Sequence, residues 1–377
     1  MSEDEARAIV AANPSSFVRV SRPESVMPAG TDAHAPEAYE TARLQLAAME
    51  AEGLLVQDER PSYYLYGQKM GEHFQVCLVA GFSVDEYDRG LVKKHEFTRP
   101  DKEDDRVRHI ETLNSQTGPV FLTYKAVAAM DEFVAKKTAG TPDVDFTGKD
   151  GVRHTSWSVR DAAEIAFIAG QFAQIPFLYI ADGHHRSAAA GRVFTARKGQ
   201  GSSGGFLTVT FPHNQMQILP YNRVLKDLNG LTPEQLLAKL DAIFILSPNG
   251  APKPTRKHEL ALFLGGQWRT LHFRPQFAAT SDPIEKLDVT LLQKFVLDPI
   301  FGITDPRTSK RINFVGGIRG TGELEKLVNG GEYACAFSMF PTSIVDLMEI
   351  ADAGGIMPPK STWFEPKLRD AMFCHKI

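Results

Sequence analysis

Residues 177–190 constrain the fold more than any other segment, because they combine the patterns of a strand, a tight turn and a helix. The segment reads FLYIADGHHRSAAA. The apolar run at 177–180 predicts a buried strand, and Asp182 with Gly183 predicts a turn. Asp182 is expected to cap the next helix, and the alanines at 188–190 let that helix pack close to the strand. The sequence therefore predicts a mixed α/β fold.

The same turn is a candidate anion site. The first amides of a helix have no intrahelical partner and lie at the positive end of the helix dipole. His184, His185 and Arg186 add side-chain donors, so a phosphate would be held from several directions. A purely structural interpretation is that Asp182 only caps the helix and the histidines are surface or packed residues. The combination of strand, turn and cap favours a binding site.

Composition narrows the class of protein. The chain has 377 residues and 43% hydrophobic content, enough for one large or two ordinary domains with a sizeable core. Its 42 basic and 46 acidic residues give a net charge of -4, so neither nucleic acid nor a membrane is expected as a partner. Three widely spaced cysteines fit reduced thiols. The acidic start of the sequence lacks a secretory pattern, and polar residues interrupt its most apolar stretch, 162–181, so the prediction is a cytoplasmic protein.

Hydrophobic periodicity predicts helices and strands in mixed order along the chain. A loop rich in Gly, Asp and Thr at 138–150 suggests an N-terminal lobe, 1–140, and a second lobe, 141–377. Ser158, Asp161 and Glu164 predict the start of a helix that leads into the strand at 177–180. The remaining predictions are helices at 37–52, 103–113 and 124–137, strands at 63–66, 74–79, 313–315 and 333–340, and an antiparallel hairpin formed by 206–211 and 216–219.

A second polar cluster, 93–108, reads KKHEFTRPDKEDDRVR. Its dense alternation of charge is typical of a solvated helix with many ion pairs. Glu96 precedes Pro100 and is therefore not yet in that helix, where it could act as a general base. Arg106 could reach an anion from the helix itself.

A third cluster, 357–367, reads MPPKSTWFEPK. Its prolines predict a rigid loop that carries Lys360, Ser361 and Lys367 and could close over a phosphate. The alternative is a packed tail in which Trp363 and Phe364 enter the core while the lysines stay in water.

These motifs together resemble the bacterial and archaeal domain-of-unknown-function family numbered 1015. The resemblance rests on ADGHHR at 181–186, on HEFT at 95–98, and on MPPKST with FEPK at 357–367. It extends to NPSSFVRVSRPES at 13–25, YYLYGQ at 63–68 and ILPYNRV at 218–224. Members of that family carry a further segment before NPSSF, for which this sequence has only twelve residues.

The DGHHR turn also resembles the phosphate-binding motif of the ParB and sulfiredoxin superfamily, which includes the archaeal free serine kinase. That kinase transfers phosphate from ADP to the hydroxyl of free serine. The resemblance implies a ParB/sulfiredoxin-like nucleotide-binding core with additional strands and helices, ADP or ATP as the nucleotide, and Mg²⁺ at its phosphates.

The leading hypothesis is therefore a nucleotide-dependent kinase of free serine or a similar hydroxyl acceptor. Asp182 or Glu96 would take the acceptor proton, and His185 would stabilise charge on the transferred group. The residues expected to bind the nucleotide are Gly183, His184, Arg186, Arg106, Lys360, Ser361 and Lys367.

Two alternatives stay open. A nucleotide-binding regulatory module would bind the same phosphates without transferring them. A metal-dependent phosphohydrolase or nuclease would use His184 and His185 as metal ligands, although no nearby carboxylate cluster has convincing ligand spacing.

Overall fold

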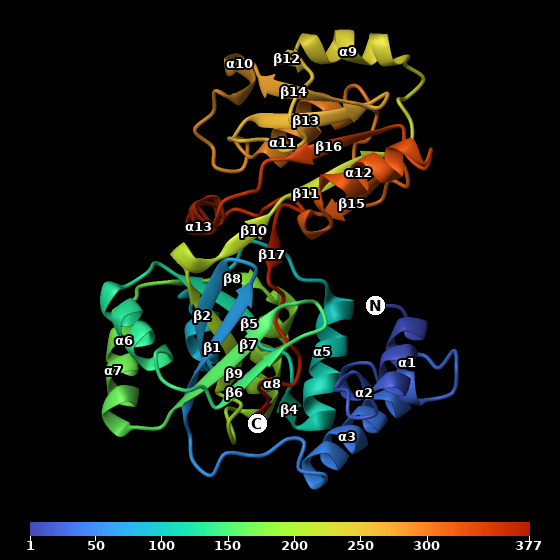
Figure 1. Cartoon of the computed structure of the whole chain (residues 1–377). Helices are drawn as coiled ribbons and strands as arrows, with labels where there is room; N and C mark the ends of the chain where they lie inside the picture. The colour runs from blue at the N-terminus through green and yellow to red at the C-terminus, as the bar shows by residue number, and fades with distance from the viewer. The chain divides into compact units, whose positions relative to one another are not determined.

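The computed structural model describes residues 1–377 and divides into two compact units. The first unit contains Met1–Gln215 and Pro366–Ile377, and the second contains Met216–Glu365. Figure 1 traces both along the chain. The boundary predicted at residue 140 falls inside the first unit, because the segment that follows it forms the edge strand β6 (Val144–Thr147) of that unit's main sheet.

An eight-stranded sheet organises the first unit, in the order β3-β8-β5-β9-β2-β1-β7-β6. Neighbouring strands are antiparallel except in the pairs β3–β8 and β5–β9. A two-stranded sheet pairs β4 (Ser115–Gln116) with β18 (His375–Lys376). The other strands of the large sheet are β1 (Tyr63–Met70), β2 (His73–Ser83), β3 (Val92–Lys93), β5 (Val120–Tyr124), β7 (Arg153–Val159), β8 (Leu178–Asp182) and β9 (Gly205–Pro212).

One face of this sheet is apolar, and two helices cover it. Met130 of α6 (Ala128–Thr138) and Ile168 of α7 (Ala162–Phe172) pack with Leu65, Leu78 and Trp157 from the strands. Figure 1 shows α6 and α7 side by side on this flank. The helix start predicted around Asp161 is confirmed, since its carboxylate accepts the amides of Ala163 and Glu164.

Alternate residues of the same strands carry polar side chains on the other face. Gln68 and His154 are fully buried there. The C-terminal segment crosses these residues: Gln68 Nε2 donates to the Lys367 carbonyl at 2.8 Å, and the Arg369 amide donates to the Tyr66 hydroxyl. The sheet therefore holds the end of the chain in place through its polar face.

The remaining helices of the first unit pack beside the sheet. Those predicted at 37–52 and 103–113 are confirmed as α3 and α5, whereas α6 begins four residues later than predicted because Tyr124 is a buried residue of β5. Arg192 of α8 forms ion pairs with Glu103 and Asp104 of α5. These helices are α1 (Glu3–Ala12), α2 (Val18–Ser21), η1 (Pro23–Val26), α3 (Pro36–Ala51), α4 (Val84–Asp88), α5 (Pro100–Leu113), α8 (His184–Arg197) and η2 (His213–Gln215).

The second unit contains an antiparallel sheet in the order β12-β14-β13-β16-β11-β15, against which α12 packs through Leu324. Its strands are β11 (Tyr221–Leu225), β12 (Phe244–Pro248), β13 (Glu259–Leu264), β14 (Gln267–Phe273), β15 (Ile312–Gly316) and β16 (Cys335–Met339). Its helices are α9 (Pro233–Asp241), α10 (Pro275–Ala278), α11 (Asp288–Leu292), the π-helical η3 (Gln293–Leu297), η4 (Gly317–Arg319), α12 (Gly320–Asn329) and α13 (Ile344–Asp352).

The predicted hairpin of 206–211 and 216–219 is wrong. β10 (Gln217–Leu219) pairs with β17 (Trp363–Glu365) in the second unit, whereas β9 stays between β5 and β2. Between them, the side-chain oxygen of Gln215 accepts the Val76 amide of β2 at 2.9 Å. The β10–β17 pair brings the ILPYNRV and FEPK motifs together.

Candidate functional site

The site is organised by the turn between β8 and α8. Gly183 has a φ of 104°, a conformation that favours glycine, and it is the N-cap residue of α8. A Cβ atom at this position would lie 3.0 Å from the Arg186 guanidinium, so the close approach of Arg186 also requires glycine. The predicted tight turn at Gly183 is confirmed.

The predicted capping role of Asp182 is wrong. No side chain caps α8, and Asp182 instead ends β8 with an exposed carboxylate 3.7 Å from Arg186 Nη2. The first backbone amides of α8, at His184, His185 and Arg186, therefore have no intrahelical acceptor. An uncapped helix start of this kind is well suited to bind an anion.

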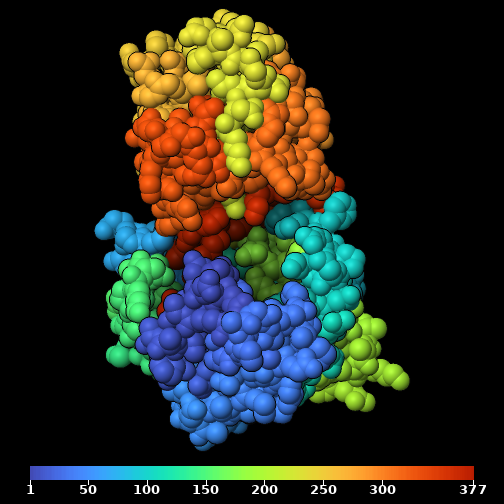
Figure 2. Space-filling view, turned by 90° about the vertical axis from the view of Figure 1, so that its right-hand side faces the viewer, coloured from blue at the N-terminus to red at the C-terminus, as the bar shows by residue number.

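These amides belong to a pocket of about 700 Å³ in the first unit. On the face seen in Figure 2, the surface is hollowed between the blue N-terminal segment and the cyan region that contains α5. The lining residues come from α2, α5, the turn before α8 and the C-terminal segment: Phe17, Ser21, Glu96, Arg99, Lys102, Asp105, Arg106, His109, Ile110, Gln116, Thr117, Gly118, Val120, Asp182, Gly183, His184, His185, Arg186 and Asp370.

His184 is held in one tautomer beside Glu96. The His95 amide donates to His184 Nε2 at 3.3 Å, so the ring proton of neutral His184 is on Nδ1. That nitrogen lies 3.5 Å from the Glu96 carboxylate. Burial, with smaller contributions from neighbouring histidines and from Lys94 and Arg186, lowers the pKa of His184 to about 2. Glu96 therefore faces a neutral N–H group.

His185 is oriented in a similar way from the next position of α8. The backbone amide of Arg99 donates to His185 Nε2 at 3.1 Å. This contact ties the start of α8 to the segment that precedes α5. It leaves Nδ1 as the nitrogen of neutral His185 that carries a proton.

Arg186 spans the middle of the pocket. Its Nη1 donates to the Pro119 carbonyl at 2.6 Å, and its charge acts on Asp370. Desolvation raises the pKa of Asp370, while Arg186 and a hydrogen bond from Ser21 oppose that shift. The guanidinium is thus positioned by a carbonyl and lies between the carboxylates of Asp182 and Asp370.

Arg106 lies in the same pocket but has an acidic partner. Its Nε and Nη2 both donate to Asp105. Desolvation alone would raise the pKa of Asp105, but Arg106, with hydrogen bonds from Tyr39 and His34, lowers it overall. The positive charge of Arg106 in the pocket is therefore compensated by Asp105.

The third sequence cluster is divided between the units. Lys360 and Ser361 belong to the second unit, where the Ser361 hydroxyl donates to the Pro358 carbonyl and the Lys360 carbonyl accepts from Arg223. Lys367 belongs to the first unit but does not line the pocket. Phe364 is buried, as expected for the packed tail.

Sequence inspection missed eight polar residues that line the pocket: Ser21, Arg99, Lys102, Asp105, His109, Gln116, Thr117 and Asp370. Arg99 and Lys102 lie within the charged cluster already singled out. His109 carries no local signal, since it follows three turns of an ordinary charged helix. Asp370 reaches the pocket only because the polar face of the sheet holds the C-terminal segment.

The pocket offers few ligands for a metal ion. No group of three or more His, Cys, Asp or Glu side chains has the geometry to hold a metal ion. Mg²⁺ commonly binds through one or two carboxylates together with substrate phosphates. The exposed carboxylate of Asp182 beside the open amides fits that arrangement. None of the helices combines the length and hydropathy that a membrane crossing needs.

The fold and pocket define a mixed α/β protein with an uncapped helix start in a polar pocket. A family model described as a protein of unknown function, DUF1015, matches residues 1–290, and the chain belongs to this family, as its motifs predicted. No curated protein matches the sequence.

Several solved structures are similar to this chain at low identity. Free serine kinase in complex with AMP is 14% identical, with a TM-score of 0.38, over 76% of this chain and 86% of that one. SbnI with a C-terminal truncation, from Staphylococcus aureus, is 11% identical, with a TM-score of 0.41, over 79% and 85%. A conserved hypothetical protein from Pyrococcus furiosus is 14% identical, with a TM-score of 0.36, over 78% and 93%.

Proposed function

We propose that this protein is a nucleotide-dependent phosphotransferase that acts on a small hydroxyl-bearing acceptor such as free serine. The observation that carries the proposal is the opening of the uncapped start of α8 into the same pocket as Arg186 and Glu96. One group of residues there can bind phosphate, and a neighbouring carboxylate can accept a proton. A transferase of phosphoryl groups needs both.

The donor phosphates would bind at the start of α8. The open amides from His184 onward and the Arg186 guanidinium offer donors from two directions. Arg99 and Lys102 also line the pocket and add positive charge. The Nδ1–H group of His185 would donate to the transferred phosphoryl group, where negative charge is concentrated.

Glu96 would be the general base. In the proposed step the acceptor hydroxyl oxygen bonds to the terminal phosphorus of the nucleotide, and the bond from that phosphorus to the leaving phosphate oxygen breaks. The hydroxyl proton passes to the Glu96 carboxylate. Because His184 is neutral, its Nδ1–H group faces Glu96 without adding a positive charge of its own.

Asp182 would have a different role from Glu96. A carboxylate close to phosphates is repulsive unless a cation lies between them. Bound Mg²⁺ would neutralise phosphate charge, and Asp182 is the carboxylate placed to hold it beside the α8 amides. Without the ion, Arg186 at 3.7 Å partly compensates the charge of Asp182.

The direct test is phosphate transfer from ADP and from ATP, with Mg²⁺, to a panel of free amino acids, with products identified by mass spectrometry. We expect O-phosphoserine or a related phosphorylated hydroxyl compound from the unmodified protein and none from Arg186→Ala. Nucleotide binding without any phosphorylated product would instead identify a regulatory module, and hydrolysis to free phosphate without an acceptor would identify a phosphohydrolase.

A further inference from the structure

A polar group in the pocket is left unexplained by phosphate transfer. His109 lies on α5 and lines the pocket, yet only 8% of its surface is exposed. Its Nε2 atom has no hydrogen-bond partner. The ring does hydrogen-bond to the backbone of Val20, and since Nε2 is unpartnered, that bond is made by Nδ1. The bond fixes the ring and leaves Nε2 as a buried atom without a partner in a residue that lines the pocket.

The hydrogen-bonding character of Nε2 follows from its surroundings. Burial and the nearby charge of Arg106 lower the pKa of His109 to about 4, so the ring is neutral near physiological pH. The bond to Val20 raises the pKa of His109, as a bond to a backbone carbonyl does. A carbonyl can only accept, so Nδ1 carries the ring proton. Nε2 is therefore a hydrogen-bond acceptor. A buried acceptor without a partner is costly, and a ligand that donates to it recovers that cost.

The neighbours of His109 indicate what kind of donor would fit. Arg106 is close enough to affect its titration, and Arg186 acts on Asp370 at the same pocket. Asp105 acts on the same ring with the opposite sign and is paired with Arg106, so the net charge beside His109 is small. A neutral amino group needs no counter-charge there, whereas an ammonium group would need one. Phe17 and Ile110 supply apolar lining beside it. A flat heteroaromatic ring with an amino substituent satisfies both conditions.

We propose that the His109 region of the pocket binds the base of the nucleotide and selects bases that carry an exocyclic amino group, such as adenine and cytosine. The inference rests on the proposed function, because it assumes that the nucleotide phosphates lie at the start of α8. In the oxo counterparts of these bases, a carbonyl oxygen replaces the amino group and faces the lone pair of Nε2. Two acceptors then meet without a proton between them.

The test is calorimetric titration of the whole protein with two matched pairs of nucleotides, ADP against IDP and CDP against UDP, with Mg²⁺. The amino-bearing member of each pair should bind about tenfold more tightly, the effect of one buried hydrogen bond. His109→Phe keeps a ring but removes the acceptor, so its ADP and CDP affinities should fall to those of IDP and UDP. The affinities for IDP and UDP should change little.

His154→Phe is the matched control. His154 is also buried, also has an unpartnered Nε2 atom, and does not line the pocket. It should therefore keep the discrimination between amino and oxo bases. The comparison of nucleotides on the unmodified protein stands even if either variant fails to fold.

The possible outcomes separate this inference from the proposed function. Equal and tight binding of all four nucleotides would overturn base selection while leaving the phosphate site intact. Discrimination that persists in His109→Phe would remove His109 from the role. Weaker binding of free serine by His109→Phe, with ADP unaffected, would overturn the inference in favour of an ammonium site. Failure of every nucleotide to bind the folded protein would overturn both proposals.

Discussion

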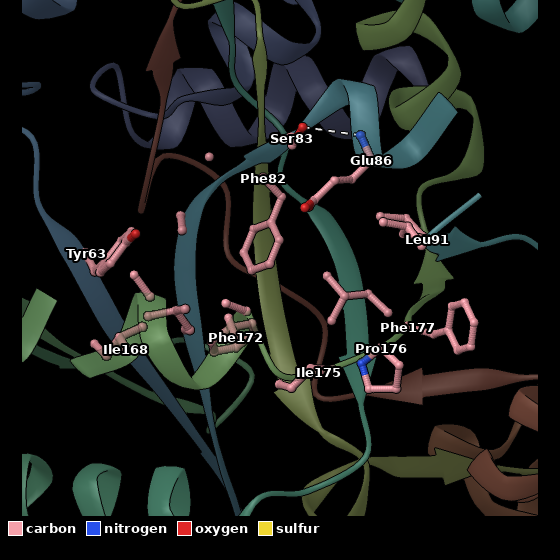
Figure 3. Close-up of a pocket in the computed structure, with 17 residues that line it drawn as sticks. Tyr63, Phe82, Ser83, Glu86, Leu91, Ile168, Phe172, Ile175, Pro176 and Phe177 are labelled. Atoms are coloured by element: carbon pink, nitrogen blue, oxygen red, sulfur yellow. Dashed lines mark hydrogen bonds between the residues drawn. The ribbon is translucent and has the colours of Figure 1, made fainter. Parts of the chain in front are cut away.

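The first unit contains two pockets that differ in whether their polar groups already have hydrogen-bond partners within the protein. The pocket shown in Figure 3 has a volume of about 460 Å³ and lies between the sheet and α7, with Phe82, Phe172 and Phe177 among its lining residues. The hydroxyl group of Ser83, which lines this pocket, already has a hydrogen-bond partner, because it accepts the Glu86 amide and so caps α4. The Ser83 hydroxyl of this pocket, whose lining side chains are mostly apolar, therefore stabilises the fold.

The pocket at the start of α8 has polar atoms that the protein itself leaves open. The first amides of α8 have no cap, and His109 Nε2 has no partner. Folding has thus concentrated unsatisfied donors and acceptors in one place, which is costly unless a ligand completes them. Open hydrogen-bonding capacity and the larger volume both favour the pocket at the start of α8 as the proposed ligand site.

The sharpest contrast between the pockets is between their carboxylates. Glu96→Gln removes the proposed base and should lower turnover by about a hundred- to ten-thousand-fold, while nucleotide affinity stays within about threefold. Glu86→Gln, on the exposed rim of the apolar pocket, is the control and should leave turnover unchanged. Steady-state transfer kinetics with both variants measure this. Equal losses in the two would abolish the distinction between the pockets.

Loss of the Arg186 guanidinium, which should weaken ADP binding, is the second largest expected effect. Arg186→Ala removes charge-assisted hydrogen bonds to phosphate and should weaken ADP binding by about ten- to a hundredfold. Arg192→Ala is the control on the same helix, since Arg192 pairs with Glu103 and Asp104 and does not line the pocket. Calorimetry on both variants gives the comparison. If Arg186→Ala binds ADP normally, the anion site lies elsewhere.

Acid should destabilise the first unit through histidines near the polar pocket. The pKa values of His95 and His109 are lowered from 6.5 to about 4, mainly by burial. Below 6.5 the unfolded histidines take up protons that the folded ones do not, so falling pH favours unfolding. The loss should approach about 1 kcal/mol per pH unit for each histidine.

Urea unfolding followed between about pH 7 and pH 5 measures this loss. The effect should fade above about pH 7.5, where both states are almost entirely neutral, and should level off for these two residues near pH 4. His109→Phe should show a shallower pH dependence by the contribution of one histidine. A free energy of unfolding that stays constant between pH 7 and pH 5 would contradict the burial of neutral imidazoles.

The smallest effect is expected from filling the apolar pocket. Ala169 is an exposed residue of α7 that lines it, so Ala169→Leu adds apolar volume there. Stability should change by no more than about 0.5 kcal/mol, as is usual for exposed positions. ADP affinity should remain within about twofold of the unmodified protein by calorimetry. A larger change in affinity would show that this pocket is coupled to ADP binding, and the two pockets would then not be independent.

Those parts of the site that depend on short-range sterics could be predicted from the sequence. The turn at Gly183 followed from its flanking strand and helix patterns, and Pro100 correctly placed Glu96 before the start of α5. The family motifs identified the family. Local backbone preferences act over a few residues, so a few residues are enough to recognise them.

Which distant residues share the pocket depends on long-range packing and could not be predicted from the sequence. Asp182 has the residue type of a helix cap, yet it ends a strand and faces Arg186. β10 pairs with β17 because pairing is chosen by the whole chain, whereas the sequence suggested its neighbour β9. His109 and Asp370 reach the pocket through packing of α5 and of the C-terminal segment. Such long-range contacts leave no local pattern, because many sequences satisfy the same burial.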